Sequence, residues 1–259
     1  MNDELALVRM DLDGSNHELV TKLAVPVAAN GTAGGSYSFY FANGYFFYVV
    51  NAQPYAFFRV DLSSERTDRL FTDLFADGSG PDGRVLFDGD FFYFDLYTPQ
   101  GVRWLCQCPC GTEEVRKLCS WPKAEAPRWD VENGTVYYYS KTDGTFYEYS
   151  IESMQSTAVS NPQLVNGPAR FDSAYYDSNY IYLVIHLKEN LRELYIFDRD
   201  YTLLQHLALP LFGDYLYAAE DKLFFSNTYS YKISHYLPMS EIGSENAELH
   251  PVKDPYALR

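Results

Sequence analysis

The sequence predicts an all-β fold, a β-propeller made of four-stranded antiparallel blades. Two observations support this prediction. A turn followed by an aromatic strand recurs about every 45 residues, a period typical of propeller repeats. The 259 residues also include 24 Tyr and 18 Phe. Tyr and Phe favour strands because their flat rings cover the half-buried face of a pleated sheet.

The repeat is clearest at the turn that opens each aromatic strand. The turn is Asn-Gly or Asp-Gly in three copies, and these dipeptides supply the positive φ angles that a two-residue hairpin needs. Aligned on one apolar position of the strand, the copies are separated by 45, 45, 45 and 42 residues. The aligned residues are Phe46, Phe91, Val136, Ile181 and Leu223. The chain therefore holds five copies of one structural unit.

Each unit is predicted to hold four strands. The first precedes the turn, and we expect these first strands at 37–41, 84–87, 128–131, 174–176 and 215–217. The aromatic second strand is a nearly continuous apolar run, which is typical of a strand buried on both faces. A third strand and a weaker fourth follow. The predicted blades are 36–75, 83–120, 128–160, 169–209 and 213–253, in a single domain over residues 1–259.

The N-terminal residues 1–25 resemble half of a blade. Residues 7–12 (LVRMDL) match the third strand at 57–62 (FFRVDL) in register, and a turn and a fourth strand follow. We therefore expect a propeller of the six-bladed type with an incomplete first blade, since closure protects sheet edges. The alternative is a five-bladed propeller with joined ends, in which the N-terminal strands complete the blade begun at 215–225.

The same strand and turn carry a family resemblance. Residues 8–16 (VRMDLDGSN) resemble the strand and turn that end each repeat of the YWTD propeller of LDL-receptor-related proteins. The aromatic strands occupy the place of the Tyr-Trp-Thr-Asp motif, but none carries it, and Asp95 alone suggests its acidic end. The chain is more similar to bacterial relatives of that propeller, a repeat domain of unknown function. The resemblance implies a six-bladed fold and a binding role, and it transfers no catalytic residue.

The charge of the chain limits its partners. Its 35 acidic and 20 basic residues give a net charge of −15. Such a surface repels phosphate backbones and anionic lipid, so we expect no nucleic-acid partner. No run of 18 apolar residues exists, so we expect no direct membrane insertion. The expected location is extracytoplasmic or at the cell surface, as part of a longer protein, with a cytoplasmic location as the alternative. The oligomeric state is left open.

All four cysteines lie in one predicted blade. If the turn between its third and fourth strands pivots at Thr112 and Glu113, Cys106 faces Cys119, and the two could form a cross-strand disulfide. Reduced thiols without a role are the favoured interpretation. A zinc site is disfavoured because zinc signatures usually pair C-x-x-C units.

A calcium site is considered at Asp11–Glu18, where oxygen ligands are spaced a little as in a calcium loop. The segment lacks the twelve-residue pattern and its terminal bidentate Glu, so a turn between strands is favoured. We expect no metal and no cofactor, with calcium bound by acidic loops as the alternative.

Trp121 and Trp129 are the candidate ligand-binding residues. They flank a proline-containing connection between blades, where an exposed Trp could stack on a sugar or contact a protein. No G-x-S-x-G motif is present, and a glycosidase carboxylate pair is defined by spatial separation that sequence does not give. We expect a binding or protein-interaction module for a protein or glycan ligand, without catalytic activity. The alternative is a glycan- or small-molecule-processing enzyme with its site at the propeller channel mouth.

Overall fold

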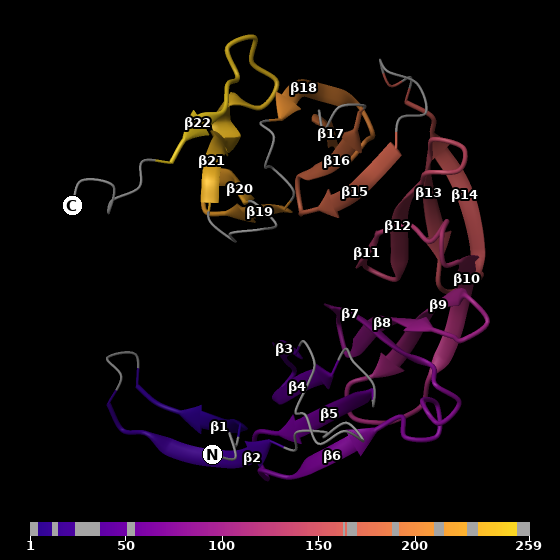
Figure 1. The fold of residues 1–259 in the computed structure, drawn as a ribbon, viewed down its shortest axis with the longest axis vertical. Coiled ribbons are helices and arrows are strands. Elements are labelled where there is room, and N and C mark those ends of the chain that lie inside the picture. Colours follow the sequence, from indigo (N-terminus) through magenta and orange to yellow (C-terminus); the bar gives the residue numbers. More distant parts are fainter. Residues whose placement is uncertain are drawn as a thin grey trace. The chain divides into compact units, whose positions relative to one another are not determined.

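The computed structural model describes residues 5–11, 15–23, 37–50, 55–162, 164, 170–187, 192–209, 215–226 and 233–252. The chain divides into two compact units. The first comprises Met1–Ala126 and Val131–Gly134, and the second comprises Pro127–Asp130 and Thr135–Arg259. Nearly all regular structure in the described ranges is strand (Figure 1). No described helix is long and apolar enough to cross a bilayer.

The first unit contains a two-stranded hairpin and two four-stranded antiparallel sheets, which we call blades 1 and 2. The strand order in both blades follows the chain. The N-terminal hairpin consists of β1 (Leu5–Arg9) and β2 (Glu18–Leu23). Blade 1 consists of β3 (Tyr37–Ala42), β4 (Tyr45–Val50), β5 (Ala56–Asp61) and β6 (Thr67–Leu70). Blade 2 consists of β7 (Gly80–Asp88), β8 (Phe91–Tyr97), β9 (Val102–Pro109) and β10 (Arg116–Pro122).

The second unit contains most of blade 3 and all of blades 4 and 5, which have the same antiparallel strand order. Blade 3 consists of β11 (Trp129–Glu132), β12 (Thr135–Ser140), β13 (Thr145–Ser150) and β14 (Gln155–Ser160). Blade 4 consists of β15 (Arg170–Tyr176), β16 (Tyr180–His186), β17 (Arg192–Asp198) and β18 (Leu203–Leu209). Blade 5 consists of β19 (Tyr215–Ala219), β20 (Lys222–Ser226), β21 (Ile233–Pro238) and β22 (His250–Pro251).

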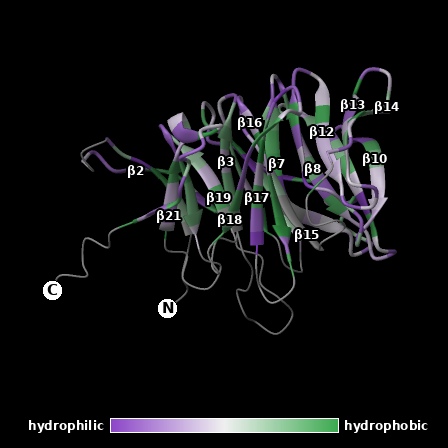
Figure 2. Cartoon of the chain, turned by 90° about the horizontal axis from the view of Figure 1, so that it is seen from above, coloured by the Kyte–Doolittle hydropathy of each residue, from purple (hydrophilic) through white to green (hydrophobic). Residues whose placement is uncertain are grey.

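The turns explain why each unit folds locally. Asn43 and Gly44 have φ angles of 51° and 78°, and Asn133 and Gly134 have φ angles of 50° and 74°. Two consecutive positive φ angles match the twist of the flanking strands, so the hairpin closes without splaying them. The second strands that follow are buried along most of their length, as in β4, β8 and β16. Figure 2 shows hydrophobic residues, in green, along the strands, for example on β7.

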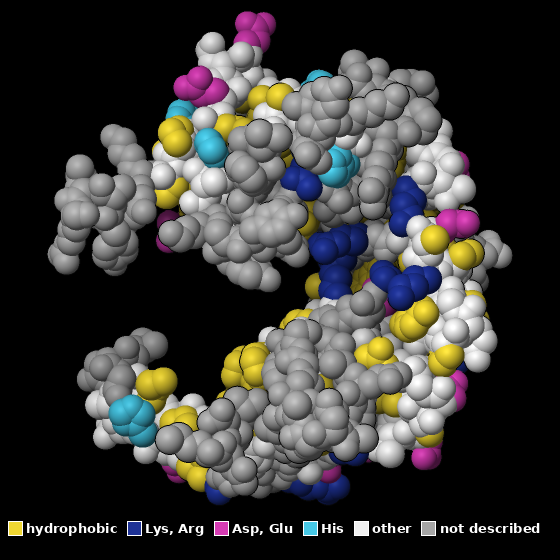
Figure 3. Space-filling model, in the orientation of Figure 1, with side chains coloured by type: hydrophobic (Ala, Val, Ile, Leu, Met, Phe, Trp, Pro, Cys, Tyr) yellow, Lys and Arg dark blue, Asp and Glu magenta, His cyan; other side chains and the backbone are white. Residues whose placement is uncertain are grey.

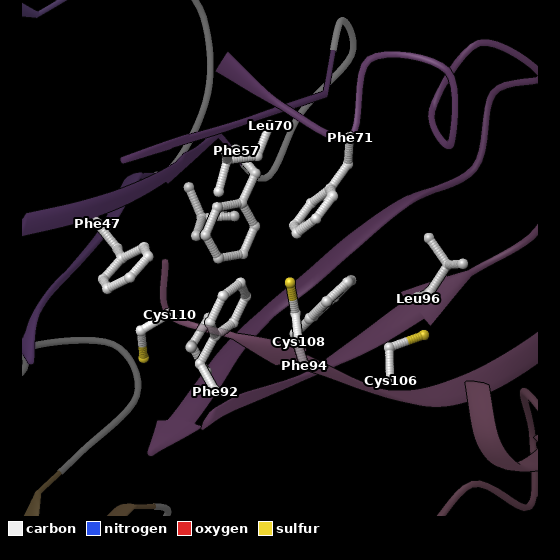
Figure 4. Close-up of a cluster of buried hydrophobic side chains, with 12 residues drawn as sticks. Phe47, Phe57, Leu70, Phe71, Phe92, Phe94, Leu96, Cys106, Cys108 and Cys110 are labelled. Carbon is white, nitrogen blue, oxygen red and sulfur yellow. The ribbon is translucent and has the colours of Figure 1, made fainter. Parts of the chain in front are cut away.

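The core between blades 1 and 2 shows how neighbouring sheets pack. Phe47 and Phe57 of blade 1 meet Phe92 and Phe94 of blade 2, with ring centroids 5.2–5.7 Å apart (Figure 4). Cys106, Cys108 and Cys110 belong to the same buried cluster. Because each sheet is apolar on this face, stacking against a similar sheet removes both faces from water.

The predicted all-β propeller class is confirmed, since five consecutive antiparallel sheets of four strands are propeller blades. The expectation of a six-bladed type is wrong. The described chain has five four-stranded sheets, and β1 and β2 form a separate two-stranded sheet. The five-bladed alternative fits this number, but β21 and β22 complete its fifth blade, so the N-terminal strands do not supply those positions.

The alignment of the second repeat is also corrected. Phe46 lies opposite Phe41, one pair beyond the turn, and in blade 2 the residue at that position is Phe92, opposite Phe87. Phe92 is fully buried, whereas Phe91 is 38% exposed. The steps are therefore 46, 44, 45 and 42 residues, because the turn of blade 2 lies at Gly89 and Asp90, one residue later than the alignment assumed.

Candidate binding site

An open aromatic surface lies on β3 of blade 1. Phe39 and Phe41 point to the face opposite blade 2, where Phe39 stacks on Phe46 at 5.9 Å and Phe41 lies 4.8 Å from the same ring. Phe39 is 50% exposed and Phe41 is 65% exposed. Figure 3 shows hydrophobic side chains at the surface of this part of the first unit. We call Phe39, Phe41 and Phe46 the aromatic face of blade 1.

The exposure of Phe39 is unusual for its position in the repeat. Phe39 lies four residues before the first turn residue, Asn43. The residues at that position in the other four blades are nearly or fully buried. They are Val85 at 3%, Trp129 at 0%, Ala174 at 1% and Leu216 at 5%. The fold therefore uses this position as core in four blades and leaves it open in one.

The N-terminal hairpin covers only part of the same face. Leu7 and Leu23 pack against a buried cluster from β4 and β5 that includes Phe46, Tyr48 and Phe58. The hairpin therefore protects the second and third strands of blade 1. Phe39 and Phe41, on the first strand, remain exposed beside it.

One arginine in the hairpin, Arg9, matches Arg59 of blade 1 in the sequence of the repeat, but the two make different contacts. Arg59 of β5 is buried, and its Nη1 donates to the carbonyl oxygens of Cys110 and Thr112, at 2.8 and 3.1 Å, in the turn between β9 and β10. Arg9 of β1 reaches Glu65, in the turn between β5 and β6, at 3.8 Å. Arg9 thus forms a long surface ion pair, with its side chain 59% exposed, whereas Arg59 forms buried hydrogen bonds between blades 1 and 2.

Two carboxylates of blade 1, those of Asp61 and Asp68, have a structural role. Asp68 accepts a hydrogen bond from Arg59 at 3.0 Å and another from Arg66 at 2.8 Å. The bond from Arg59 is the main cause that lowers the pKa of the Asp68 carboxyl. The Ser63 hydroxyl and the Ser63 and Ser64 N–H groups donate to Asp61, which lowers its pKa to about 2. Both carboxylates are ionised at neutral pH and stabilise turns and strand contacts.

The two predicted Trp candidates have different environments. Trp129 is fully buried on β11, so it lacks the exposure on which its candidacy as a ligand-binding residue depended. It occupies the repeat position of Phe39, and burial follows from that position. Trp121 lies on β10 opposite Arg103 and is partly exposed. Trp121 therefore stays a candidate ligand-binding residue. It lies on β10, whereas Trp129 lies on β11.

The cysteines are part of the core. All four are free, and Cys106, Cys108 and Cys110 are buried (Figure 4). Cys106 lies opposite Lys117, and Cys119 lies opposite Leu105, because the register shifts between Lys117 and Cys119. The expected facing of Cys106 and Cys119, on which the disulfide prediction depended, is therefore wrong. Burial raises the pKa of the Cys108 and Cys119 thiols to about 12 and raises that of Cys106 as well.

Tyrosine–carboxylate pairs occur in the second unit. The Tyr182 hydroxyl donates to Asp177 at 2.5 Å, and the Tyr201 hydroxyl donates to Glu148 at 2.8 Å. Burial first, and then the carboxylate partner, raises the pKa of both phenols. A phenol whose pKa is raised stays protonated at neutral pH, so these two hydroxyls serve as hydrogen-bond donors and not as nucleophiles.

The possible calcium loop lies partly outside the described residues, which omit 12–14. Its described part forms a turn, in which Asn16 donates to Asp11 at 2.6 Å and the Asp11 N–H donates to the Ser15 carbonyl. Among the side chains that the structure describes, no three of His, Cys, Asp or Glu gather in a way that could hold a metal ion.

The sequence matches no protein-family model and no curated protein. Solved structures do share the fold. One from a study of two prolyl endopeptidases has a TM-score of 0.62 at 11% identity, over 98% of this chain and 39% of the other. TolB from Acinetobacter baumannii has a TM-score of 0.50 at 14% identity, over 95% of this chain and 61% of TolB. The chain thus spans less than two thirds of either protein, and at such identities the likeness establishes the propeller fold alone.

Proposed function

We propose that this chain is a binding module and that the aromatic face of blade 1 is its binding surface. The observation that carries the proposal is the exposure of Phe39, half open where its four counterparts are at most 5% exposed. Contiguous exposed apolar residues on a folded protein mark interaction sites. A binding role is also what the resemblance to YWTD propellers implies.

The free energy gained by burying the exposed rings of Phe39 and Phe41 supports a role in binding. Fully burying a Phe side chain contributes roughly 1.5–3 kcal/mol relative to leaving it exposed. About half of the Phe39 side chain and more of Phe41 is open. A partner that covers both would therefore gain on the order of 2–3 kcal/mol from these two rings. A gain of that size makes the pair an anchor for a partner whose other contacts are polar.

Catalysis has less support than binding. The described hydroxyls of Tyr182 and Tyr201 and the buried thiols have raised pKa values, so none of them is an activated nucleophile. The endopeptidase likeness extends over a fold segment at low identity and transfers no activity.

A random-peptide display selection on the purified protein tests the proposal. We expect enriched peptides that bind at least ten-fold more weakly to the double variant Phe39→Ser/Phe41→Ser. The matched control is Tyr217→Ser, which removes a ring 41% exposed on the first strand of blade 5 and should leave binding unchanged. The proposal is wrong if no peptide is enriched, or if enriched peptides bind the double variant as tightly as the unchanged protein.

A further inference from the structure

We propose that blade 2 holds a second binding site, which takes a sugar acid, that is, a sugar ring that carries a carboxylate. The site consists of Tyr97, Arg103 and Trp121, which we call the Arg103 row, together with Lys123 beside it. It lies on a different blade from the aromatic face of blade 1, so the inference goes beyond the proposed function and does not depend on it.

The residues of the Arg103 row lie on three neighbouring strands of blade 2 (Figure 1). Tyr97 ends β8, and in the register of the sheet it lies opposite Arg103 of β9. On its other side, Arg103 lies opposite Trp121 of β10. Residues directly opposite one another in antiparallel strands project to the same face, with Cβ atoms about 4.5–5.5 Å apart. The row therefore places one guanidinium between two aromatic side chains.

The row lies where this face of blade 2 becomes accessible to solvent. Side chains alternate between the two faces of a strand, so Asp95 and Leu105 share the face of the row, one step further along the sheet. Both are buried, at 4% and 0% exposure. Tyr97, Arg103 and Trp121 are each partly exposed. A ligand that reaches the row therefore meets two rings and a guanidinium at the rim of the buried part of the blade.

Asp95 fixes one end of the Arg103 guanidinium from the buried side. Its Oδ2 lies 3.7 Å from Arg103 Nη1, and the two side chains are 5% and 19% exposed. A buried carboxylate without a cation beside it is costly, so the ion pair keeps the arginine in position. The guanidinium carries five N–H donors in a planar fork, which matches the two oxygens of a carboxylate. Arg103 is therefore suited to recognise a carboxylate on a ligand.

Lys123 supplies the net positive charge of the site, since Asp95 offsets the charge of Arg103. The exposed Lys123 ammonium lies over the face of the Tyr97 ring, 4.0 Å from its centroid. The Lys123 backbone N–H donates to the Gly101 carbonyl at 2.8 Å, which holds the residue beside the turn between β8 and β9. A cation over a ring face is attracted by the ring's negative face. The ligand charge that complements this arrangement is negative.

A ligand with both an apolar face and a carboxylate uses every part of the site. Aromatic rings pack against the apolar face of a sugar ring, and an arginine binds a carboxylate through two parallel hydrogen bonds. A neutral sugar would use the rings without the cations, and a small carboxylate would use the cations without the rings. The net charge of −15 repels a polyanion more strongly than a single carboxylate. A sugar ring with one carboxylate therefore fits the site best.

The probe is methyl glucuronide, and its matched control is methyl glucoside, which has the same ring with a hydroxymethyl group in place of the carboxylate. Benzoate is the second control, because it carries a carboxylate on a flat ring that is not a sugar. Binding to the full chain is measured by isothermal titration calorimetry at low salt, where exposed charges are least screened. Tryptophan fluorescence gives a second readout, since Trp121 belongs to the row.

We expect the glucuronide to bind in the millimolar range, at least ten-fold more tightly than the glucoside or benzoate. Arg103→Lys keeps a charge beside the buried carboxylate but loses the planar fork, so the affinity for the glucuronide should fall at least ten-fold. Lys123→Gln should weaken the glucuronide several-fold and leave the glucoside unchanged. The matched control is Lys117→Gln, which should leave binding unchanged. It removes an exposed lysine of the same blade that lies over the Trp104 ring, at 5.3 Å, on the other face of β9.

Circular dichroism shows whether each variant is folded, and Lys123→Gln tests the inference even if Arg103→Lys unfolds, because Lys123 is exposed. The inference is overturned if the glucuronide does not bind at millimolar concentration or if the glucoside binds as tightly. It is also overturned if Lys117→Gln weakens binding as much as Lys123→Gln does. Benzoate that binds as tightly as the glucuronide would identify an aromatic carboxylate as the ligand in place of a sugar acid. Each of these results would leave the proposed role of the aromatic face of blade 1 unchanged.

Discussion

The corrected register of blade 2 makes a direct prediction about two adjacent phenylalanines. Phe92 is fully buried, and five other Phe rings have centroids within 6.3 Å of its own. Phe91 is the residue before it, and it is 38% exposed at the start of β8. Truncating each to alanine changes the same number of atoms in very different surroundings.

The two substitutions should differ in stability by several kilocalories. Replacing a buried Phe by Ala costs about 3–5 kcal/mol, because the lost transfer free energy adds to the free energy of the cavity that remains. Phe92→Ala should fall in this range, since rings on both blades would lose a neighbour. Phe91→Ala leaves no closed cavity and should cost less than about 1 kcal/mol.

Urea unfolding followed by tryptophan fluorescence and circular dichroism measures both values. We expect the midpoint of Phe92→Ala to drop sharply and that of Phe91→Ala to remain close to the unchanged protein. A matched control is Phe41→Ala, another exposed ring, which should behave as Phe91→Ala does. Equal losses for Phe91→Ala and Phe92→Ala, or a larger loss for Phe91→Ala, would refute the register and the packing argument built on it.

Three further predictions concern the first unit. Arg59→Met should destabilise the protein by about 3–5 kcal/mol, because it removes a buried charge that holds Asp68 and two carbonyl groups. The control is Arg66→Met, which removes an exposed partner of the same carboxylate and should cost less than about 1 kcal/mol; similar losses in urea would contradict this. Cys108 should resist a thiol reagent at pH 8 in the folded protein, because burial raises its pKa to about 12 and the thiolate is the reactive form. Four equivalents should react in urea, and rapid labelling of the folded protein would contradict the burial argument. Asp61 has a folded pKa of about 2, below its ordinary value of 3.8, so its contribution to stability is present above pH 4 and is lost as the pH falls toward 2. Asp61→Asn should therefore lose less stability than the unchanged protein over that window, as measured by urea midpoints at each pH; parallel pH profiles would rule out this contribution.

Much of the fold could be predicted because the signals are local. Asn43-Gly44 and Asn133-Gly134 demand positive φ angles, and the strands that follow them begin where the turns end. The first strand expected at 37–41 is observed as Tyr37–Ala42, and the third strand expected at 57–62 is observed as Ala56–Asp61. Turn chemistry and runs of apolar residues fix such elements without knowledge of the neighbouring blade.

Two predictions about residue positions were wrong because a shift of one residue in a turn or a strand changes which side chains are buried and which face each other. A constant step of 45 residues placed Phe91 in the core, but the Gly89-Asp90 turn shifts that position to Phe92. A regular hairpin placed Cys106 opposite Cys119, but the irregularity between Lys117 and Cys119 changes the pairing. Bulges shift every following residue in register, and the sequence carries no clear mark of them.

The candidate site was missed for a different reason. Trp129 and Phe39 occupy the same position of the repeat, and Trp129 was favoured from the sequence because it flanks a proline-containing connection between blades, where an exposed ring could stack on a ligand. What separates the two is coverage, since Trp129 is buried and Phe39 is half exposed. The type of a residue does not show whether it is buried, because burial at this position depends on whether another strand packs against it.

The packing of the N-terminal hairpin accounts for part of the difference in exposure. Residues 7–12 match a third strand in sequence, and in the structure β1 pairs with β2 in a hairpin. In the repeat, a second strand covers the first strand of the next blade, as Phe47 covers Phe87. The hairpin packs on β4 and β5, and Phe39 and Phe41 on the first strand, β3, remain exposed. The proposed binding surface thus includes a residue, Phe39, whose counterparts in the other four blades are core residues, and only its exposure in the folded protein distinguishes it from them.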